Sequence, residues 1–152
     1  VGKIKEKYLT EAIREYEKRL SRYCRLEIVE LADEKTPDGA GAAEEAAIRA
    51  REGERILKAI KEAAYVIALA IEGKMLDSVE LSRKIEALGT GGVSHIVFVI
   101  GGSLGLSSAV MKRAEYALSF SKMTFPHQLM RVILLEQIYR SFRIMKNEPY
   151  HK

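Results

Sequence analysis

The chain has 152 residues, of which 47% are hydrophobic and 30% are charged, and its formal net charge at pH 7 is +4. These values predict one soluble globular domain over residues 1–152 and exclude a second domain. No apolar run approaches the roughly 20 residues of a membrane span. The single cysteine, Cys24, permits no disulfide within the chain, so we expect a cytoplasmic protein.

The first quarter of the chain predicts a helix between two short extended segments. Val1-Gly2-Lys3 is typical of the end of a strand and its turn, and we expect a short apolar strand to precede it. From Lys5 to Tyr23, apolar side chains recur at three- and four-residue intervals, which predicts an amphipathic surface helix. Leu26 to Leu31 predicts a short strand, and residues 33–41 predict a turn-rich loop.

The middle of the chain alternates helices and strands. Glu44 to Glu62 predicts a helix, and Tyr65 to Ile71 predicts a fully buried strand. Ser78 is the expected cap of a further helix that ends at the glycines of residues 89–92. His95 to Ile100 is a continuous apolar run, typical of a strand buried on both faces. This order of elements predicts an α/β fold with a parallel sheet.

A glycine-rich turn, Gly101-Gly102-Ser103-Leu104-Gly105, directly follows this run. Glycines at the carboxyl end of a buried strand allow a sharp turn and a close approach to a ligand, and open parallel sheets bind ligands at that edge. The spacing G-G-x-x-G differs from the dinucleotide-binding pattern G-x-G-x-x-G. We therefore expect a ligand site here, without assigning a dinucleotide to it.

The segment from Leu118 to Gln128 predicts a short strand and a polar loop, which ends where Pro126 lies in the first turn of a long helix. That helix has apolar residues on more than one face, which favours a two-fold dimer. These residues are Leu129, Met130, Val132, Ile133, Leu134, Leu135, Ile138, Tyr139, Phe142 and Ile144.

Three segments together resemble a known family: VIGGSLGLS, LSFSKMTFPHQLMRVILLEQIYR and the terminal EPYHK. They are similar to the RlmH type of SPOUT (trefoil-knot) methyltransferase, and the resemblance covers essentially the whole chain. It implies a parallel-sheet α/β/α fold with a deep C-terminal trefoil knot at about residues 95–145, in a homodimer. It also implies that the protein uses S-adenosylmethionine, without a metal, to methylate N3 of a pseudouridine in the large-subunit (23S) ribosomal RNA of the assembled ribosome.

The resemblance also implies a cofactor site on the backbone of the glycine turn and of the loop from Leu118 to Phe125. Leu69 and Leu118 would provide apolar walls, and a side chain at Gly101 or Gly102 would displace the ligand. The implied contacts are Leu69, Gly101, Gly102, Gly105, Leu118, Phe120, Ser121, Lys122, Met123, Thr124 and Phe125.

Transfer of a methyl group to nitrogen requires aligned reactants and removal of the N3 proton of the base. The resemblance implies that Tyr150 and His151 reach the site, from the partner subunit. Histidine changes charge near neutral pH, so His151 suits a general base. Arg140 would favour the anionic imide, or would simply pair with Glu136 one turn earlier. For His127, just inside the helix, we expect a structural hydrogen bond to the loop.

Positive charge is concentrated in the C-terminal third, as RNA phosphate contacts require. The residues are Lys112, Arg113, Lys122, Arg131, Arg140, Arg143, Lys146 and Lys152. Because the chain has no separate RNA-binding domain, we expect it to read a large RNA target by shape.

Two other functions remain open at the level of sequence. One is a different α/β enzyme that binds a nucleotide or phosphate ester at the glycine turn. The other is a ribosome-associated dimer that has lost methyl transfer, against which the intact glycine turn and the Tyr150-His151 ending argue. The three histidines, His95, His127 and His151, lack the spacing of metal ligands.

Overall fold

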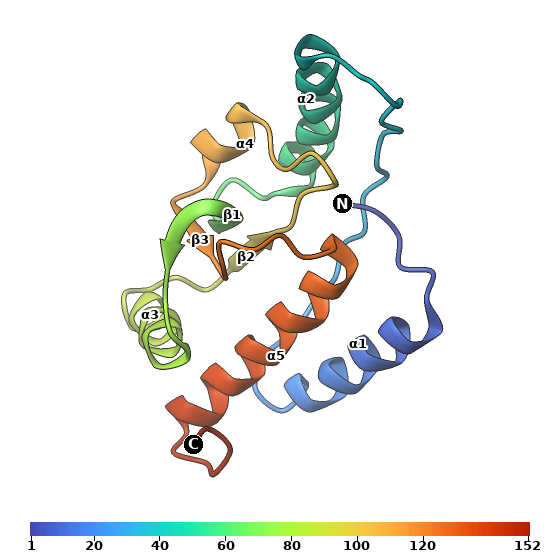
Figure 1. The fold of residues 1–152 in the computed structure, drawn as a ribbon. Helices are drawn as coiled ribbons and strands as arrows, with labels where there is room; N and C mark the ends of the chain where they lie inside the picture. The colour runs from blue at the N-terminus through green and yellow to red at the C-terminus, as the bar shows by residue number, and fades with distance from the viewer. The chain divides into compact units, whose positions relative to one another are not determined.

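The computed structural model describes residues 1–152, which form five helices and three strands (Figure 1). The elements are α1 (Lys7–Leu20), α2 (Ala42–Ala59), β1 (Tyr65–Met75), α3 (Ser78–Thr90), β2 (Ile96–Val99), α4 (Ser108–Arg113), β3 (Tyr116–Ser119) and α5 (His127–Met145).

The chain forms two compact units. The sheet unit comprises Val1–Lys3, Val29–Met75 and His95–His127, and the helical unit comprises Ile4–Ile28, Leu76–Ser94 and Gln128–Lys152. Each unit is built from segments that are distant in sequence. The expectation of one domain stays a prediction.

The three strands of the sheet unit are parallel and lie in the order β2-β1-β3, which confirms the predicted parallel sheet. In the central strand, Val66, Ile67 and Ala68 are completely buried. In β2 only Val99 is buried, so the prediction that this strand is buried on both faces was wrong. The strand order explains the difference, because β2 is at the edge of the sheet and has a neighbouring strand on one side only.

Strand β1 continues to Met75, four residues beyond the predicted end at Ile71. Its pairing with β3 shifts register, so that Leu118 lies opposite both Leu69 and Lys74. At Gly73 a Cβ atom would lie 2.6 Å from the carbonyl oxygen of Ala117, so only glycine allows this approach of the two strands.

The core of the sheet unit joins one residue from each of four elements: Ile56 of α2, Val66 of β1, Val99 of β2 and Val110 of α4. Helix α4 was not predicted, because it has only six residues. Its cap is Ser107, whose hydroxyl oxygen accepts the backbone N–H of Val110 over 3.3 Å.

The segment Leu26 to Leu31 forms no strand, so this prediction was wrong. A strand requires a ladder of backbone hydrogen bonds to a neighbour. The carbonyl of Leu31 accepts the N–H of Gly2 over 2.8 Å, but residues 26–31 are not part of a strand.

In the helical unit, α1 and α5 lie side by side (Figure 1), with the rings of Tyr16 and Tyr139 edge to face at 6.3 Å between centroids. Helix α3 contacts α5 through the hydroxyl of Ser78, which donates to Oε1 of Gln137 over 2.7 Å.

The cap of α3 is one residue earlier than predicted. Asp77 and Glu80 exchange hydrogen bonds between side chain and backbone, over 2.7 and 2.9 Å, in a capping box. Helix α5 begins at His127, directly after the proline that was predicted to lie in its first turn. None of the five helices is both long and apolar enough to cross a membrane.

Candidate active site

The glycine turn follows β2 and closes on itself. The N–H of Gly105 donates to the carbonyl oxygen of Gly102 over 3.1 Å. Gly105 has φ of +83°, a conformation that favours glycine, and a Cβ atom placed there would meet nothing within 4 Å. The turn therefore has an open side at Gly105, where a ligand can approach the backbone closely.

The other two glycines face the protein itself, which adds a reason for their presence. A Cβ atom at Gly101 would lie 2.9 Å from the carbonyl carbon of Gly105. At Gly102 it would lie 3.0 and 3.1 Å from the two carboxylate oxygens of Glu52. A side chain at either position would disturb the turn or its support, which is a reason for glycine in addition to the expected displacement of a ligand, and that expectation stays a prediction.

Glu52 is a residue that the sequence analysis missed. It belongs to α2 and is only 4% exposed, beneath Gly102. Its Oε2 accepts the backbone N–H of Glu34 over 2.9 Å. The carboxylate of Glu34 in turn pairs with Arg51 at 3.4 Å and Arg55 at 2.5 Å. In a helix rich in alternating charges, nothing in the sequence marks this one carboxylate as buried.

The loop after β3 is irregular and mostly exposed. Ser119 donates its hydroxyl to the carbonyl of Ser121 over 3.1 Å, and the hydroxyl oxygen of Ser121 accepts the N–H of Met123 over 3.0 Å. Phe120 and Ser121 are half-buried, whereas the next four residues are exposed, with Met123 at 74%. These four are Lys122, Met123, Thr124 and Phe125.

The two apolar wall residues differ in what they can offer. Leu69 and Leu118 are opposite each other in β1 and β3, and Leu69 is half-buried. The side chain of Leu118 is only 2% exposed, because it fills the core. This side chain therefore offers a ligand little surface in the structure, although its backbone remains available, and its place in a cofactor site stays a prediction.

The residue set fits S-adenosylmethionine, which presents polar edges for backbone groups and an adenine ring for apolar contacts. Two irregular segments, the glycine turn and residues 120–125, follow parallel strands and have backbone groups outside any helix or ladder. The open side of Gly105 and the exposed Phe125 add space and apolar surface.

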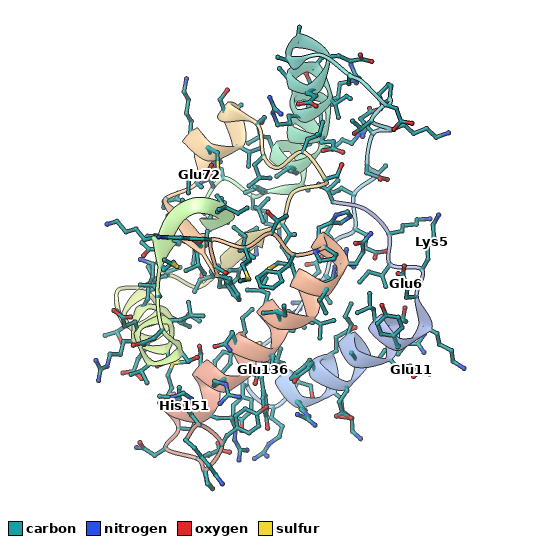
Figure 2. All side chains as sticks on the ribbon, in the orientation of Figure 1. Lys5, Glu6, Glu11, Glu72, Glu136 and His151 are labelled. Carbon is teal, nitrogen blue, oxygen red and sulfur yellow. The ribbon has the colours of Figure 1, made fainter.

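A second group of candidate residues lies in the helical unit, around Glu136 of α5. Arg140 donates to both oxygens of Glu136, from Nη2 to Oε1 over 2.8 Å and from Nε to Oε2 over 3.4 Å. Tyr150 donates its hydroxyl to the same Oε1 over 3.0 Å. Nη1 of Arg140 lies 3.2 Å from Nδ1 of His151. Figure 2 shows Glu136 on α5 and His151 at the end of the chain. From the sequence, Glu136 was expected only as a partner for Arg140.

These contacts set the protonation of Tyr150 and Arg140. Hydrogen bonding to Glu136 raises the pKa of the Arg140 guanidinium above its ordinary value. Burial and the hydrogen bond to Glu136 raise the pKa of Tyr150. Tyr150 therefore remains a neutral hydrogen-bond donor near neutral pH and is not a base.

The contact between Arg140 and His151 also fixes the proton of the imidazole. A guanidinium only donates hydrogen bonds, so Nδ1 of His151 must be the acceptor. The neutral ring then has its proton on Nε2. In this arrangement Nε2 is a donor, and Nδ1 faces the guanidinium of Arg140.

The tail contributes more to packing than its polar composition predicts. The ring of Tyr150 meets that of Tyr139 edge to face at 5.0 Å, and the Arg140 guanidinium lies 4.6 Å from the centroid of Tyr150. Tyr150 is therefore packed against α5. His151 and Lys152 are exposed.

The surroundings of His127 and Cys24 favour a structural role for both residues. A Cβ atom at Gly2 would lie 2.9 Å from Nε2 of His127, so this imidazole is packed closely against the start of the chain. Cys24 follows α1 and is half-buried, and burial raises the pKa of its thiol. No three His, Cys, Asp or Glu side chains gather closely enough to hold a metal ion.

The predicted basic residues are divided between the units, and three of their guanidinium groups are paired with carboxylates, that of Arg140 with Glu136 and those of Arg113 and Arg143 as follows. Arg113 pairs with Glu115 at 2.8 Å and donates to the carbonyls of three neighbouring residues. Arg143 pairs with Glu148 at 2.8 Å and is largely buried. A contact with RNA phosphate is therefore not expected of either guanidinium. Lys112, Lys122, Lys146 and Lys152 are exposed.

Comparison of the sequence with known proteins identifies its family. The family model described as "Predicted SPOUT methyltransferase" matches residues 1–151. The chain is 66% identical to "Ribosomal RNA large subunit methyltransferase H" of Bifidobacterium adolescentis, 64% to the protein of that name in Clostridium perfringens and 62% to that in Clostridium kluyveri. Each match covers 100% of this chain and 96% of the relative. The chain belongs to the SPOUT methyltransferase family.

Proposed function

We propose that this protein is an S-adenosylmethionine-dependent methyltransferase of large-subunit ribosomal RNA, and that its target atom is N3 of a pseudouridine. The observation that carries the proposal is the similarity, along the whole chain, to relatives whose name states ribosomal RNA large subunit methyltransferase. The resemblance of the segments around Gly101, Leu118 and Tyr150 supports the finer target.

The glycine turn and the loop of residues 120–125 would hold the cofactor. Backbone groups of Gly101, Gly102 and Gly105 would bind its polar edges, with Glu52 supporting the turn from beneath. Leu69 and Phe125 would contact its apolar parts, since both have accessible surface. When bound, S-adenosylmethionine would supply an activated methyl group on its sulfonium.

The group around Glu136 would act on the RNA base. Arg140 stabilises the negative charge that develops on the imide when N3 loses its proton. As Arg140 turns from His151 toward the imide, Nδ1 of His151 becomes free to accept that proton. Tyr150 remains a donor and holds Glu136 in place, which limits how far Arg140 can move.

We also propose a homodimer with the C-terminal trefoil knot of the family. Several large apolar side chains are exposed in the single chain, among them Ile71 at 49%, Met75 at 55% and Met123 at 74%. Such surface favours a partner subunit, and a two-fold dimer is the simplest arrangement. Sedimentation should show a dimer at micromolar concentrations. A monomer at every concentration would contradict this part of the proposal.

The central experiment offers S-adenosylmethionine with a labelled methyl group to the protein, with three RNA substrates in separate reactions. These are assembled ribosomes, isolated large subunits and protein-free ribosomal RNA, all from cells that lack the protein. We expect label in large-subunit RNA, at one pseudouridine, and the highest rate with assembled ribosomes. Label on an unmodified uridine, or none on any substrate, would overturn the corresponding part of the proposal.

Calorimetry distinguishes the alternative of a different nucleotide-binding enzyme. Titration with S-adenosylmethionine should give saturable binding, whereas titration with NAD or ATP should give none. The opposite result would favour the alternative function. A control titration with the Gly101→Val variant, described below, tests whether the heat arises at the glycine turn.

A further inference from the structure

The chain turns back on itself directly after α5. The N–H groups of Lys146, Asn147 and Glu148 donate to the carbonyls of Phe142, Ile144 and Arg143 over 3.0, 3.1 and 2.9 Å. Asn147 adopts a positive φ of 54°, a conformation that ends helices. This turn determines the direction in which the last residues of the chain leave the helix.

Side chains hold the turn from three segments. Nη1 of Arg143 donates to Oε2 of Glu148 over 2.8 Å, and its Nη2 donates to the carbonyl of Pro149 over 3.0 Å. The hydroxyl of Tyr23, which follows α1, donates to the same Oε2 of Glu148 over 2.8 Å. The hydroxyl oxygen of Tyr23 also accepts a longer bond, of 3.4 Å, from Nη1 of Arg143. We call Tyr23, Arg143 and Glu148 the tail latch.

The tail latch is itself rigidly supported. The ring of Tyr23 stacks on that of Phe142, with centroids 5.5 Å apart and planes inclined by 12°. The guanidinium of Arg143 lies 5.8 Å from the ring of Tyr139 and 5.9 Å from that of Tyr150. The side chain of Arg143 is only 18% exposed. The latch therefore joins the packed α1 and α5 helices to the two residues that precede Tyr150.

We propose that Arg143, Glu148 and Tyr23 are positioning residues for methyl transfer, which place Tyr150 and His151 beside Glu136 and Arg140. This inference rests on the proposed function. The latch touches no reacting atom in the proposal. It acts through the tail, because Pro149, whose carbonyl Arg143 holds, is bonded directly to Tyr150.

The chemistry of Arg143 argues for a positioning role rather than a contribution to stability alone. Its Nε is buried and has no hydrogen-bond partner, which is unfavourable for folding. Its two terminal nitrogens nevertheless hold a carboxylate and a carbonyl in a fixed geometry, which only the planar guanidinium can do. Lysine at this position removes the unpaired Nε and keeps the charge, but it cannot hold both partners.

The Arg143→Lys exchange is therefore the sharpest test. Because the charge is kept, attraction to RNA phosphates should not change. We expect kcat to fall about ten- to a hundredfold, because a small misplacement of a catalytic group has effects of this size. The dissociation constant for S-adenosylmethionine and the KM for ribosomes should remain near the values of the unaltered protein. Arg14→Lys, the same exchange at an exposed position of α1, is the matched control.

A double-mutant cycle tests whether the latch acts through the tail. If it does, adding Arg143→Lys to a His151→Ala chain should cause little further loss of kcat, since the group to be placed is already absent. Independent losses that multiply would overturn the proposal, as would full activity of Arg143→Lys. An equal loss of cofactor affinity and kcat in Arg143→Lys would also overturn it, because it would indicate general damage.

A readout that needs no activity separates this proposal from the proposed function. The chain has three histidines, so NMR of histidine-labelled protein can follow the ring of His151 directly, with His151→Ala for assignment. We expect the His151 resonances to shift or broaden in Arg143→Lys and in Glu148→Gln, but not in Arg14→Lys. If the protein methylates no RNA, the proposed function fails, and unchanged His151 resonances in both variants would then overturn the latch separately.

Discussion

The hydroxyl of Tyr150 donates a hydrogen bond to Oε1 of Glu136 over 3.0 Å, although the two residues are separated by 14 positions in the sequence. The same oxygen accepts Nη2 of Arg140 over 2.8 Å. One carboxylate thus connects the helix with the tail. It also restrains the guanidinium that we assign to the developing charge on the base.

Glu136→Gln should lower turnover while leaving cofactor affinity unchanged. The amide is nearly the same shape but lacks the charge that restrains Arg140, so we expect kcat to fall about tenfold or more. The pair is only partly buried, and we expect a loss of about 1 kcal/mol in the free energy of unfolding. Steady-state kinetics and urea denaturation measure the two effects. A variant with normal kcat would show that Glu136 has only a structural role.

Tyr150→Phe tests the hydroxyl alone, because the ring can still pack against Tyr139. We expect a loss of about 1 kcal/mol in stability from the missing hydrogen bond. If Tyr150 only holds Glu136, the rate should fall less than in Glu136→Gln. Kinetics that show the larger loss for Tyr150→Phe would instead place its hydroxyl on the RNA base.

The three glycines of the turn should respond differently to alanine. At Gly101 the new Cβ atom meets backbone at 2.9 Å, whereas at Gly102 it meets the end of the Glu52 side chain at 3.0 Å, which can move. We expect Gly101→Ala to destabilise the protein by about 1–3 kcal/mol and Gly102→Ala to have a smaller effect. Gly105→Ala should cost about 1–2 kcal/mol because of its positive φ.

Calorimetric titration of the folded alanine variants with S-adenosylmethionine then tests the cofactor site. We expect Gly101→Ala and the larger Gly101→Val to bind at least about tenfold more weakly, because the turn can no longer close as it does. A Gly101→Val protein that is folded and binds normally would place the cofactor elsewhere.

Chains with complementary defects should restore activity if the active site is shared between subunits. We expect dimers of a His151→Ala chain and a Gly101→Val chain to be partly active, because one of the two sites combines an intact turn with an intact tail. His151→Ala is preferable to deleting the tail, since Tyr150 contributes packing. Activity of the co-expressed, doubly tagged dimer should be compared with that of each homodimer. No activity in mixed dimers would assign the tail to its own subunit.

Protonation of Glu115 at acid pH should lower the stability of the sheet unit. Burial opposes the change, but hydrogen bonds from the backbone N–H groups of Val66 and Glu115 and the charge of Arg113 lower the pKa of this carboxyl below its ordinary value of 4.5. A lowered folded-state pKa gives stability that is present above the unfolded-state value and lost as the pH falls through the folded-state value. The expected loss therefore begins below about pH 4.5.

Glu115→Gln is the matched control for this pH dependence. The carboxyl is 39% exposed, so its contribution should be under about 1 kcal/mol. Urea denaturation from neutral to acid pH should show a difference between the two proteins that shrinks as the pH falls. A constant difference over this range would mean that the charge of Glu115 is not involved.

The sequence by itself determined most helices, the positions of the three strands and the parallel sheet, because these follow from local residue patterns and from the order of elements. Pro126 was predicted to mark the start of a long helix, and α5 begins directly after it. The glycine turn was evident too, since glycine is the one residue whose conformational freedom is visible in the sequence.

The tertiary structure alone decided which charged side chains are buried or shared. Glu52 and Glu34 are the same type of residue and both have charged neighbours in the sequence. Only Glu52 lies beneath Gly102, because the face of α2 that carries it is turned toward the glycine turn. Likewise, Arg143 was expected to contact RNA because it is a basic residue of the C-terminal third. In the structure it holds the tail, because Glu148 and Pro149 turn back toward it. Burial and hydrogen bonding depend on partners that are distant in sequence, and no local pattern records which partners those are.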